Sequence, residues 1–191
     1  MAKVVVKSKI KKVKRKFPVK LIAPDYLGSK VLGSSNVTDL NSLVGKTSKI
    51  SLMYITGSVK NQNIRLVFKV VEVNSGEAKT EVVVYSQVPY FLGRYVKTGS
   101  ELIEDSFIVV SKDGKKLRVK PFIVAKTKVS SMISTAIRNK TRELLEKEIS
   151  SKQSGEFINH VIMYKLQNML RSELKKITPI KTFEFKKVLV E

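Results

Sequence analysis

The change of hydrophobic period after Lys128 constrains the fold of this chain more than any other sequence feature. Residues 19–128 hold short β-favouring runs separated by Gly, Asn, Ser and Asp, a pattern typical of strands. From Val129 onward apolar residues recur at helical spacing, and residues 180–190 return to a β-favouring run. A sequence that passes from strands to helices and back to a strand predicts an α+β fold.

The mainly β part, residues 19–128, is punctuated by turns. Residues 74–76 and 112–114 are predicted hairpin turns, because their glycine adopts the positive φ that tight connections require. Residues 57–63 are polar without an acid and predict a third, looser connection, and residues 88–99 are expected to contain a short helix ended by Gly99. The strands are expected in "VKLIAP", "SKISLMYITG", "IRLVFKVVEV", "AKTEVVVYSQV", "SFIVVS" and "KLRVKPFIVAK".

Two long helices are predicted in residues 129–178, the second with Ser154 as its N-cap. The run 180–190 is expected to add a strand to the earlier sheet. Residues 19–191 are therefore predicted to form a single α+β domain behind a basic tail, residues 1–18. The first helix is expected to bury one face made of Val129, Met132, Ile133, Ala136, Ile137, Leu144 and Leu145.

Charge points to the class of partner. The chain carries 37 Lys and Arg against 16 Asp and Glu, a formal net charge of +21. The first 20 residues hold nine cations and no acid, and the remainder is also strongly basic. Such a field attracts polyanions and repels itself without one, so a nucleic acid is the first candidate. A basic amphipathic tail also suits a membrane surface, but its apolar stripe is narrow, and no membrane partner is expected.

Composition argues against several further classes. The chain has no Cys, which excludes disulfides and thiolate metal sites and favours a cytoplasmic location. We find no run of about 18 apolar residues and no signal-peptide pattern, so neither a membrane span nor secretion is expected. Aromatic residues make up 7% and Trp is absent. This argues against a face built from many stacked bases and favours contacts with phosphate and RNA shape.

The sequence offers little to a catalytic mechanism. His160 is the only histidine and has no Cys or second His to act with, which favours a structural role. The acidic residues within 101–105 could hold a hard cation, but a solvated edge or ion pairs with lysines fit their spacing better. "VGKT" lacks the glycine of a phosphate-binding loop, because Asn41 stands in its place. We therefore expect no enzyme activity, no cofactor and no metal.

Electrostatic contacts are the remaining chemistry. Residues 115–142 hold nine cations and no acid, and in the strand around Leu117 and Val119 cations alternate with apolar residues. The following helix is basic early and acidic late, against the preference of the helix dipole, which favours a binding role for the basic half. We predict that phosphates are contacted by Lys7, Lys9, Lys11, Lys12, Lys14, Arg15, Lys16, Lys20, Lys115, Lys116, Arg118, Lys120, Lys126, Lys128, Arg138, Lys140 and Arg142.

Several stretches, in colinear order over nearly the whole chain, resemble one family. It is the family of small-subunit ribosomal proteins of archaea and eukaryotes known as S-three-Ae, or eS-one, and the length is similar to the archaeal form. The resemblance implies a β-barrel-like core with packed helices. It also implies phosphate contacts by Arg94 and Lys97, which follow the short helix. The stretches are "KLIAP", "IRLVFKVVEV", "KDGKKLRVKP", "TAIRNKTRELLEKEI" and "ELKKITPIKTFEFKKVLV".

The resulting hypothesis is a structural component of the small ribosomal subunit that binds ribosomal RNA by charge neutralisation. The basic tail is expected to become ordered among phosphates. The resemblance further implies a place on the platform, beside neighbouring ribosomal proteins and the messenger RNA near its exit. The alternative is a regulatory or chromatin-like protein that binds nucleic acid reversibly, although no helix-turn-helix or aromatic RNA-binding motif is present.

Overall fold

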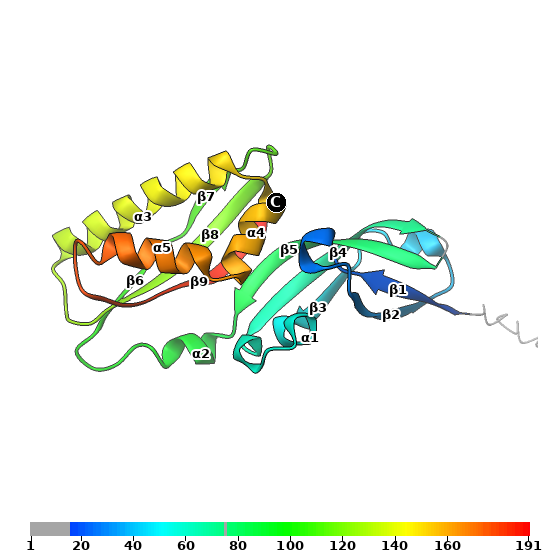
Figure 1. Cartoon of the computed structure of the whole chain (residues 1–191), viewed down its shortest axis with the longest axis horizontal. Coiled ribbons are helices and arrows are strands. Elements are labelled where there is room, and N and C mark those ends of the chain that lie inside the picture. Colours follow the sequence, from blue (N-terminus) through cyan, green and yellow to red (C-terminus); the bar gives the residue numbers. More distant parts are fainter. Residues whose placement is uncertain (1–15, 75) are drawn as a thin grey trace, which may run out of the picture.

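The computed structural model describes residues 16–74 and 76–191, so most of the predicted tail lies outside the described residues. The described part is an α+β structure, as predicted (Figure 1). Its elements, apart from three short 3-10 turns, are β1 (Phe17–Ile22), β2 (Val31–Val37), β3 (Thr47–Ser51), α1 (Leu52–Thr56), β4 (Ile64–Asn74), β5 (Glu77–Gln87), α2 (Pro89–Gly93), β6 (Glu101–Glu104), β7 (Phe107–Val110), β8 (Lys116–Ala125), α3 (Ser131–Ser151), α4 (Ser154–Ile162), α5 (Lys165–Leu174) and β9 (Ile180–Val190).

The described strands form one nine-stranded sheet in which β5 connects two halves. β4 pairs with β5 along its length, β1 pairs in parallel with the first residues of β5, and β9 pairs with residues 84–86 near its end. β2 lies beside β1, β3 beside β4, β8 beside β9, and both β6 and β7 beside β8. The final strand therefore joins the earlier sheet, as expected.

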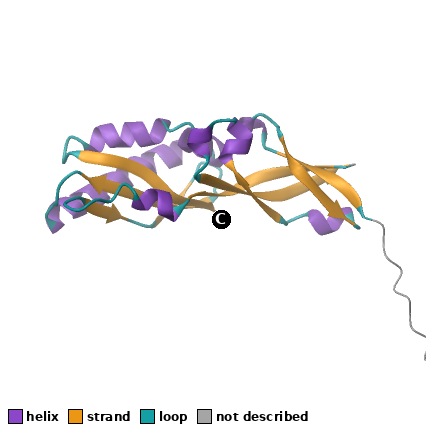
Figure 2. Cartoon of the chain, turned by 90° about the horizontal axis from the view of Figure 1, so that it is seen from below, coloured by secondary structure: helices purple, strands orange, loops and turns teal. Residues whose placement is uncertain are grey.

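The sheet does not close, which corrects the expectation of a barrel-like core. β1 and β9 use different parts of the same side of β5, so the halves diverge from it and give an elongated molecule (Figure 1). α3, α4 and α5 cover one face of the half that contains β6 to β9 (Figure 2). The main core lies between these helices and the sheet and includes Ile137, Leu145, Phe157, Leu170 and Phe185.

The helical region differs from prediction in two respects. The second long helix is divided into α4 and α5. Tyr164 adopts a left-handed backbone conformation (φ 59°), which is incompatible with a right-handed helix and interrupts it. At this break the carbonyl of Val161 accepts from the side-chain amide of Gln167 at 2.8 Å and from the backbone N–H of Tyr164 at 3.2 Å. The first helix is present, but Met132 and Ile133 are exposed, and its buried stripe begins only at Ile137.

The β half also differs from prediction, in one additional strand and in two element boundaries. β2 was not predicted, and the strand predicted from residue 48 ends at Ser51, whose hydroxyl accepts from the amide of Met53 and begins α1. The hairpins β4–β5 and β7–β8 are confirmed, with Gly76 at φ 102° and Gly114 at φ 75°. The short helix is confirmed as α2, but it ends at Gly93 rather than Gly99.

Candidate nucleic-acid interface

A row of polar side chains crosses the sheet on the face that turns away from the main core. Arg65 of β4 is paired with Ser86 of β5, Ser86 with Lys187 of β9, and Lys187 with Lys120 of β8. Residues paired across neighbouring strands point to the same face of a sheet. The flanking Leu66, Val119 and Val188 are fully or almost fully buried in the core, which directs the polar row outward. Three cations therefore meet in one line.

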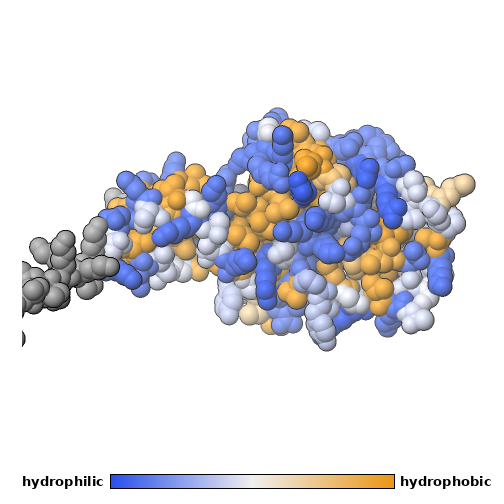
Figure 3. Space-filling model, turned by 180° about the vertical axis from the view of Figure 1, so that it is seen from behind, coloured by the Kyte–Doolittle hydropathy of each residue, from blue (hydrophilic) through white to orange (hydrophobic). Residues whose placement is uncertain are grey.

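This row lies in a cavity of about 490 Å³ with an apolar floor that includes Val67 and Val84. Five cations line it and no acid does; we call it the basic groove and define it by Lys49, Arg65, Lys120, Lys186 and Lys187. Figure 3 views the molecule from the side opposite to α3–α5 and shows hydrophilic side chains gathered beside apolar patches on this face. The sheet thus presents several cations on rigid strands rather than on loops.

Most groove cations have no acid to neutralise them. Lys186 pairs with Glu104 at 2.8 Å, whereas Lys49, Arg65, Lys120 and Lys187 form no ion pair with any described residue. Lys120 and Lys187 stand directly opposite each other in the β8–β9 ladder. Like charges in this position destabilise a sheet. An external anion would remove that repulsion, so the groove has the electrostatics of a phosphate-binding surface.

The cations of α3, in contrast, have partners within the fold. Arg142 donates from Nε and Nη2 to the two carboxylate oxygens of Asp105 at 2.6 and 2.8 Å, and its guanidinium lies 5.7 Å from the centroid of the Phe107 ring. This charge-assisted hydrogen bonding holds the pKa of Asp105 below its usual range. Arg138 donates to the carbonyl of Glu104 at 3.3 Å. These two side chains tie the β6–β7 connection to α3.

Lys140 and Lys147 both pair with Glu143, at 2.9 and 2.8 Å. Their hydrogen bonds lower the pKa of Glu143 to about 2, so it is ionised at neutral pH. Hence the basic early part of α3 is compensated by neighbouring acids. The sequence placed Lys120 and Lys140 in one acid-free window, but in the structure Lys140 pairs with Glu143 whereas Lys120 forms no ion pair with any described residue.

The other predicted contact residues that the structure describes are distributed over the surface. The alternation predicted for β8 is confirmed in its first half, where Leu117 and Val119 are buried between cations, but residues 121–125 are all buried. Lys115 pairs with Glu81 at 2.7 Å and Arg118 with Glu191 at 3.4 Å. The exposed predicted residues are Lys16, Lys20, Arg94, Lys97, Lys116, Lys126 and Lys128. Outside the described residues lie Lys7, Lys9, Lys11, Lys12, Lys14 and Arg15.

Sequence reasoning missed Lys49, Arg65, Lys186 and Lys187. A signal was present, because Arg65 alternates with buried residues in "IRLVF" and the two lysines follow Phe185 in the final strand. The alternation of apolar and polar residues predicts which side chains share a face of one strand, but it does not predict which strand lies beside it. The pairing of β5 with β9, which brings Arg65 and Lys187 into one row, joins segments about a hundred residues apart.

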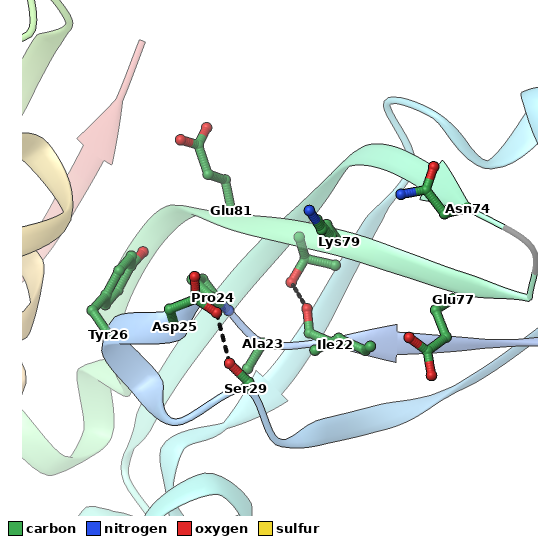
Figure 4. Close-up of a pocket in the computed structure, with 11 residues that line it drawn as sticks. Ile22, Ala23, Pro24, Asp25, Tyr26, Ser29, Asn74, Glu77, Lys79 and Glu81 are labelled. Carbon is green, nitrogen blue, oxygen red and sulfur yellow. Dashed lines mark hydrogen bonds between the residues drawn. The ribbon is translucent and has the colours of Figure 1, made fainter.

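A second cavity, of about 530 Å³, lies between the end of β1 and the start of β5 (Figure 4). Figure 4 shows the carboxylates of Asp25, Glu77 and Glu81 distributed around it. Asp25 accepts a hydrogen bond from Ser29 at 2.7 Å, and burial raises the pKa of Tyr26 to about 12. The cavity holds three acids and one cation, Lys79, so its lining repels phosphate, unlike that of the basic groove.

The remaining sequence features have structural partners. In the acidic cluster, Glu104 pairs with Lys186 and Asp105 with Arg142, in agreement with the ion-pair interpretation. His160 is half-buried, with Nδ1 3.3 Å from the ammonium of Lys152. Among the described residues, no group of three or more His, Cys, Asp or Glu is arranged to hold a metal ion. None of the helices in the described part is long and apolar enough to span a membrane.

Comparison with known proteins assigns the family. The profile of the Ribosomal S3Ae family matches residues 5–191. The chain belongs to this family. Its relatives include the small ribosomal subunit protein eS1 of Archaeoglobus fulgidus, which is 30% identical over 188 residues, covering 95% of this chain and 89% of the relative. The eS1 protein of Nanoarchaeum equitans is 26% identical over 179 residues, with 93% and 90% covered.

Membership of the ribosomal S3Ae family confirms the resemblance found in the sequence, including its similarity to archaeal forms. A third relative, the eS1 protein of Desulfurococcus amylolyticus, is 28% identical over 164 residues, with 86% of this chain covered. The match spans both halves of the sheet and all three C-terminal helices. The chain is thus a ribosomal protein of the small-subunit type, and the basic groove is its candidate interface.

Proposed function

We propose that this S3Ae-family chain is a structural, non-catalytic component of the small ribosomal subunit in the cytoplasm, and that it binds ribosomal RNA through the basic groove. One observation carries the proposal. Arg65, Lys120 and Lys187 stand in a single cross-strand row with no acidic partner among the described residues. The relatives named small ribosomal subunit protein eS1 support the subunit assignment.

The groove suits a phosphate backbone for three physical reasons. Lysine provides a point charge that tolerates many phosphate positions, while Arg65 can donate two parallel hydrogen bonds to one phosphate. Each neutralised phosphate releases condensed counterions, which makes binding favourable and dependent on salt. The apolar floor at Val67 and Val84 lowers the local dielectric, and this strengthens each contact.

Other cations extend this surface in the proposal. The tail, residues 1–18, and the exposed Lys20, Arg94, Lys97, Lys116, Lys126 and Lys128 add further phosphate contacts outside the groove. Arg118 is paired with Leu189, one cross-strand row away from Lys120, and can exchange Glu191 for a phosphate. Arg138, Lys140 and Arg142 instead maintain the fold through their internal partners. Neighbouring platform proteins and the messenger RNA near its exit are proposed partners of other surfaces.

The test uses two triple variants with the same loss of charge. The groove variant carries Arg65→Gln, Lys120→Gln and Lys187→Gln. The matched control, called the helix variant, carries Lys140→Gln and Lys147→Gln on α3 and Lys176→Gln just beyond α5, and these three lysines are all paired with acids. Tagged wild type and both variants are expressed in cells, and lysates are sedimented through sucrose gradients in high salt with magnesium.

Wild type and the helix variant should migrate with the small subunit after the high-salt wash, and the groove variant should be depleted from it. Recovery of the wild type only in the soluble top fractions would contradict a structural role and leave a reversible nucleic-acid binder. Equal retention of both variants would instead retain the subunit assignment but remove the groove as its RNA contact.

A further inference from the structure

Tyr90 is an exposed aromatic residue at the end of the basic groove. It follows Val88 and Pro89, which line the groove, and 75% of its surface is accessible to solvent. Tyr54 is similarly exposed, at 77%, but neither it nor its chain neighbours line the groove, whereas at Tyr90 a partner bound in the groove would bury the ring, which is favourable. The question is therefore what covers this ring in the assembled state.

The backbone beneath Tyr90 is firmly anchored. Leu92 is buried in a cluster with Phe122 and Val124, and the rings of Phe91 and Tyr95 meet edge to face at 5.4 Å. The ammonium of Lys181 donates to the carbonyl of Tyr95 at 2.8 Å. α2 thus holds Tyr90 in a fixed place, and its exposure does not arise from an unsupported loop.

One face of the Tyr90 ring is already occupied by a cation. The guanidinium of Arg94, one helical turn later, lies 5.0 Å from the ring centroid. The opposite face of the ring remains available. A flat aromatic surface beside a guanidinium and next to a cationic groove matches the chemistry of a nucleotide, in which a planar base is joined to an anionic phosphate.

We propose that an unpaired base of the RNA stacks on the free face of Tyr90 while its backbone lies in the basic groove. The proposal rests on the RNA-binding function above and adds that the bound strand is locally unpaired there. A single platform agrees with the low aromatic content, because it requires one stacked base rather than a row. An apolar peptide would use the ring but not the unpaired cations beside it.

The absence of Trp from the chain allows a specific reporter. In the full-length Tyr90→Trp variant the indole is the only tryptophan, and its fluorescence is quenched when a base stacks on it. The control is Met132→Trp, at a position 85% exposed at the start of α3. Both proteins are titrated with short single-stranded oligoadenylate. Quenching of the Tyr90→Trp protein alone, at the concentration where the oligonucleotide binds by anisotropy, is the expected result.

Affinity provides the second readout. Tyr90→Ala should weaken binding of oligoadenylate about tenfold, since stacking of one base contributes on that scale, and should leave an RNA duplex of equal length unaffected. Tyr90→Phe keeps the ring and should bind as wild type. Binding without quenching, or an equal loss for the single strand and the duplex, overturns the stacking proposal alone. Failure of the wild type to bind either RNA overturns the RNA-binding function itself.

Discussion

The basic groove and the long helix α3 carry the same kind of charge in different surroundings. On α3, Arg142 and Lys140 each contact a carboxylate within hydrogen-bonding distance. In the groove, Lys120 and Lys187 face each other with no acid at either. The fold neutralises the first set internally, and under the proposed function an external anion neutralises the second. Basic residues that look equivalent in a sequence can therefore stabilise the fold or bind a partner, and only their neighbours decide which.

Glu184 differs from the acids that pair with α3, because it is a buried acid close to the basic groove. It lies in β9 and is only 8% exposed, and its carboxylate accepts from the side chain of Gln87 at 2.8 Å. Gln87 also lines the groove. Burial raises the pKa of Glu184 to about 7, against a smaller lowering effect of the Gln87 hydrogen bond and the Arg171 charge.

The largest effect is expected from Glu184→Gln. In the folded protein Glu184 keeps its proton up to a pH of about 7, whereas the unfolded chain loses it at about 4.5. A raised pKa of an acid means that the free energy of unfolding falls as pH rises between these values, here by roughly 3 kcal/mol. Glu184→Gln, which cannot ionise, should remove this part of the pH dependence.

Urea unfolding of both proteins at several pH values measures the effect. The difference between their free energies of unfolding isolates Glu184 from other titrating groups. A difference that does not change between pH 4.5 and pH 7 would show that the carboxyl is not held protonated by burial.

Lys187→Glu tests the groove side of the comparison, because it should raise the stability of the fold and weaken RNA binding. It replaces a repulsive pair with an attractive one opposite Lys120, which should raise the free energy of unfolding by about 0.5 kcal/mol. The same substitution should weaken RNA binding about tenfold, because a phosphate contact is replaced by repulsion. Urea unfolding and filter binding measure the two quantities, with Lys187→Gln as intermediate control. A less stable variant would mean that Lys187 is not repelled in the free protein.

Arg142→Ala should have the smallest effect on RNA and act only on the fold. Asp105 has a lowered pKa, so its pairing stabilises the fold above its unfolded pKa and is lost as pH falls through the folded value. The variant should unfold at a higher pH during acid titration followed by circular dichroism, with unchanged RNA affinity. Arg142→Lys, which keeps the charge without the two-fold hydrogen bond, should lie between. A loss of RNA affinity at unchanged stability would place Arg142 in the interface.

Much of the fold could be predicted from local patterns. The alternation around Leu117 and Val119, the glycine turns at residues 76 and 114 and the helical period after residue 128 all reflect short-range rules. The break at Tyr164 could not be predicted, because no proline or glycine marks it and Gln167 supports it from three residues ahead. The open sheet depends on where β1 and β9 pair with β5, which is a long-range choice.

The candidate site was only partly predictable for the same reason. Lys120 was recognised because it alternates with apolar residues in its own strand. Its neighbours Lys187 and Arg65 come from strands whose register no local pattern specifies. The internal partners of Arg138 and Arg142, the carbonyl of Glu104 and the carboxylate of Asp105, were not foreseen because they lie over thirty residues away in sequence.

The salt dependence of RNA binding by the two triple variants tests the central claim most directly. Each phosphate contact that is lost should reduce the slope of log K against log salt by about 0.7 to 0.9. The account predicts that the groove variant loses about two to three such increments, while the helix variant, with the same net charge, keeps the wild-type slope. Equal reductions in both variants would contradict it, because binding would then follow total charge and not the groove.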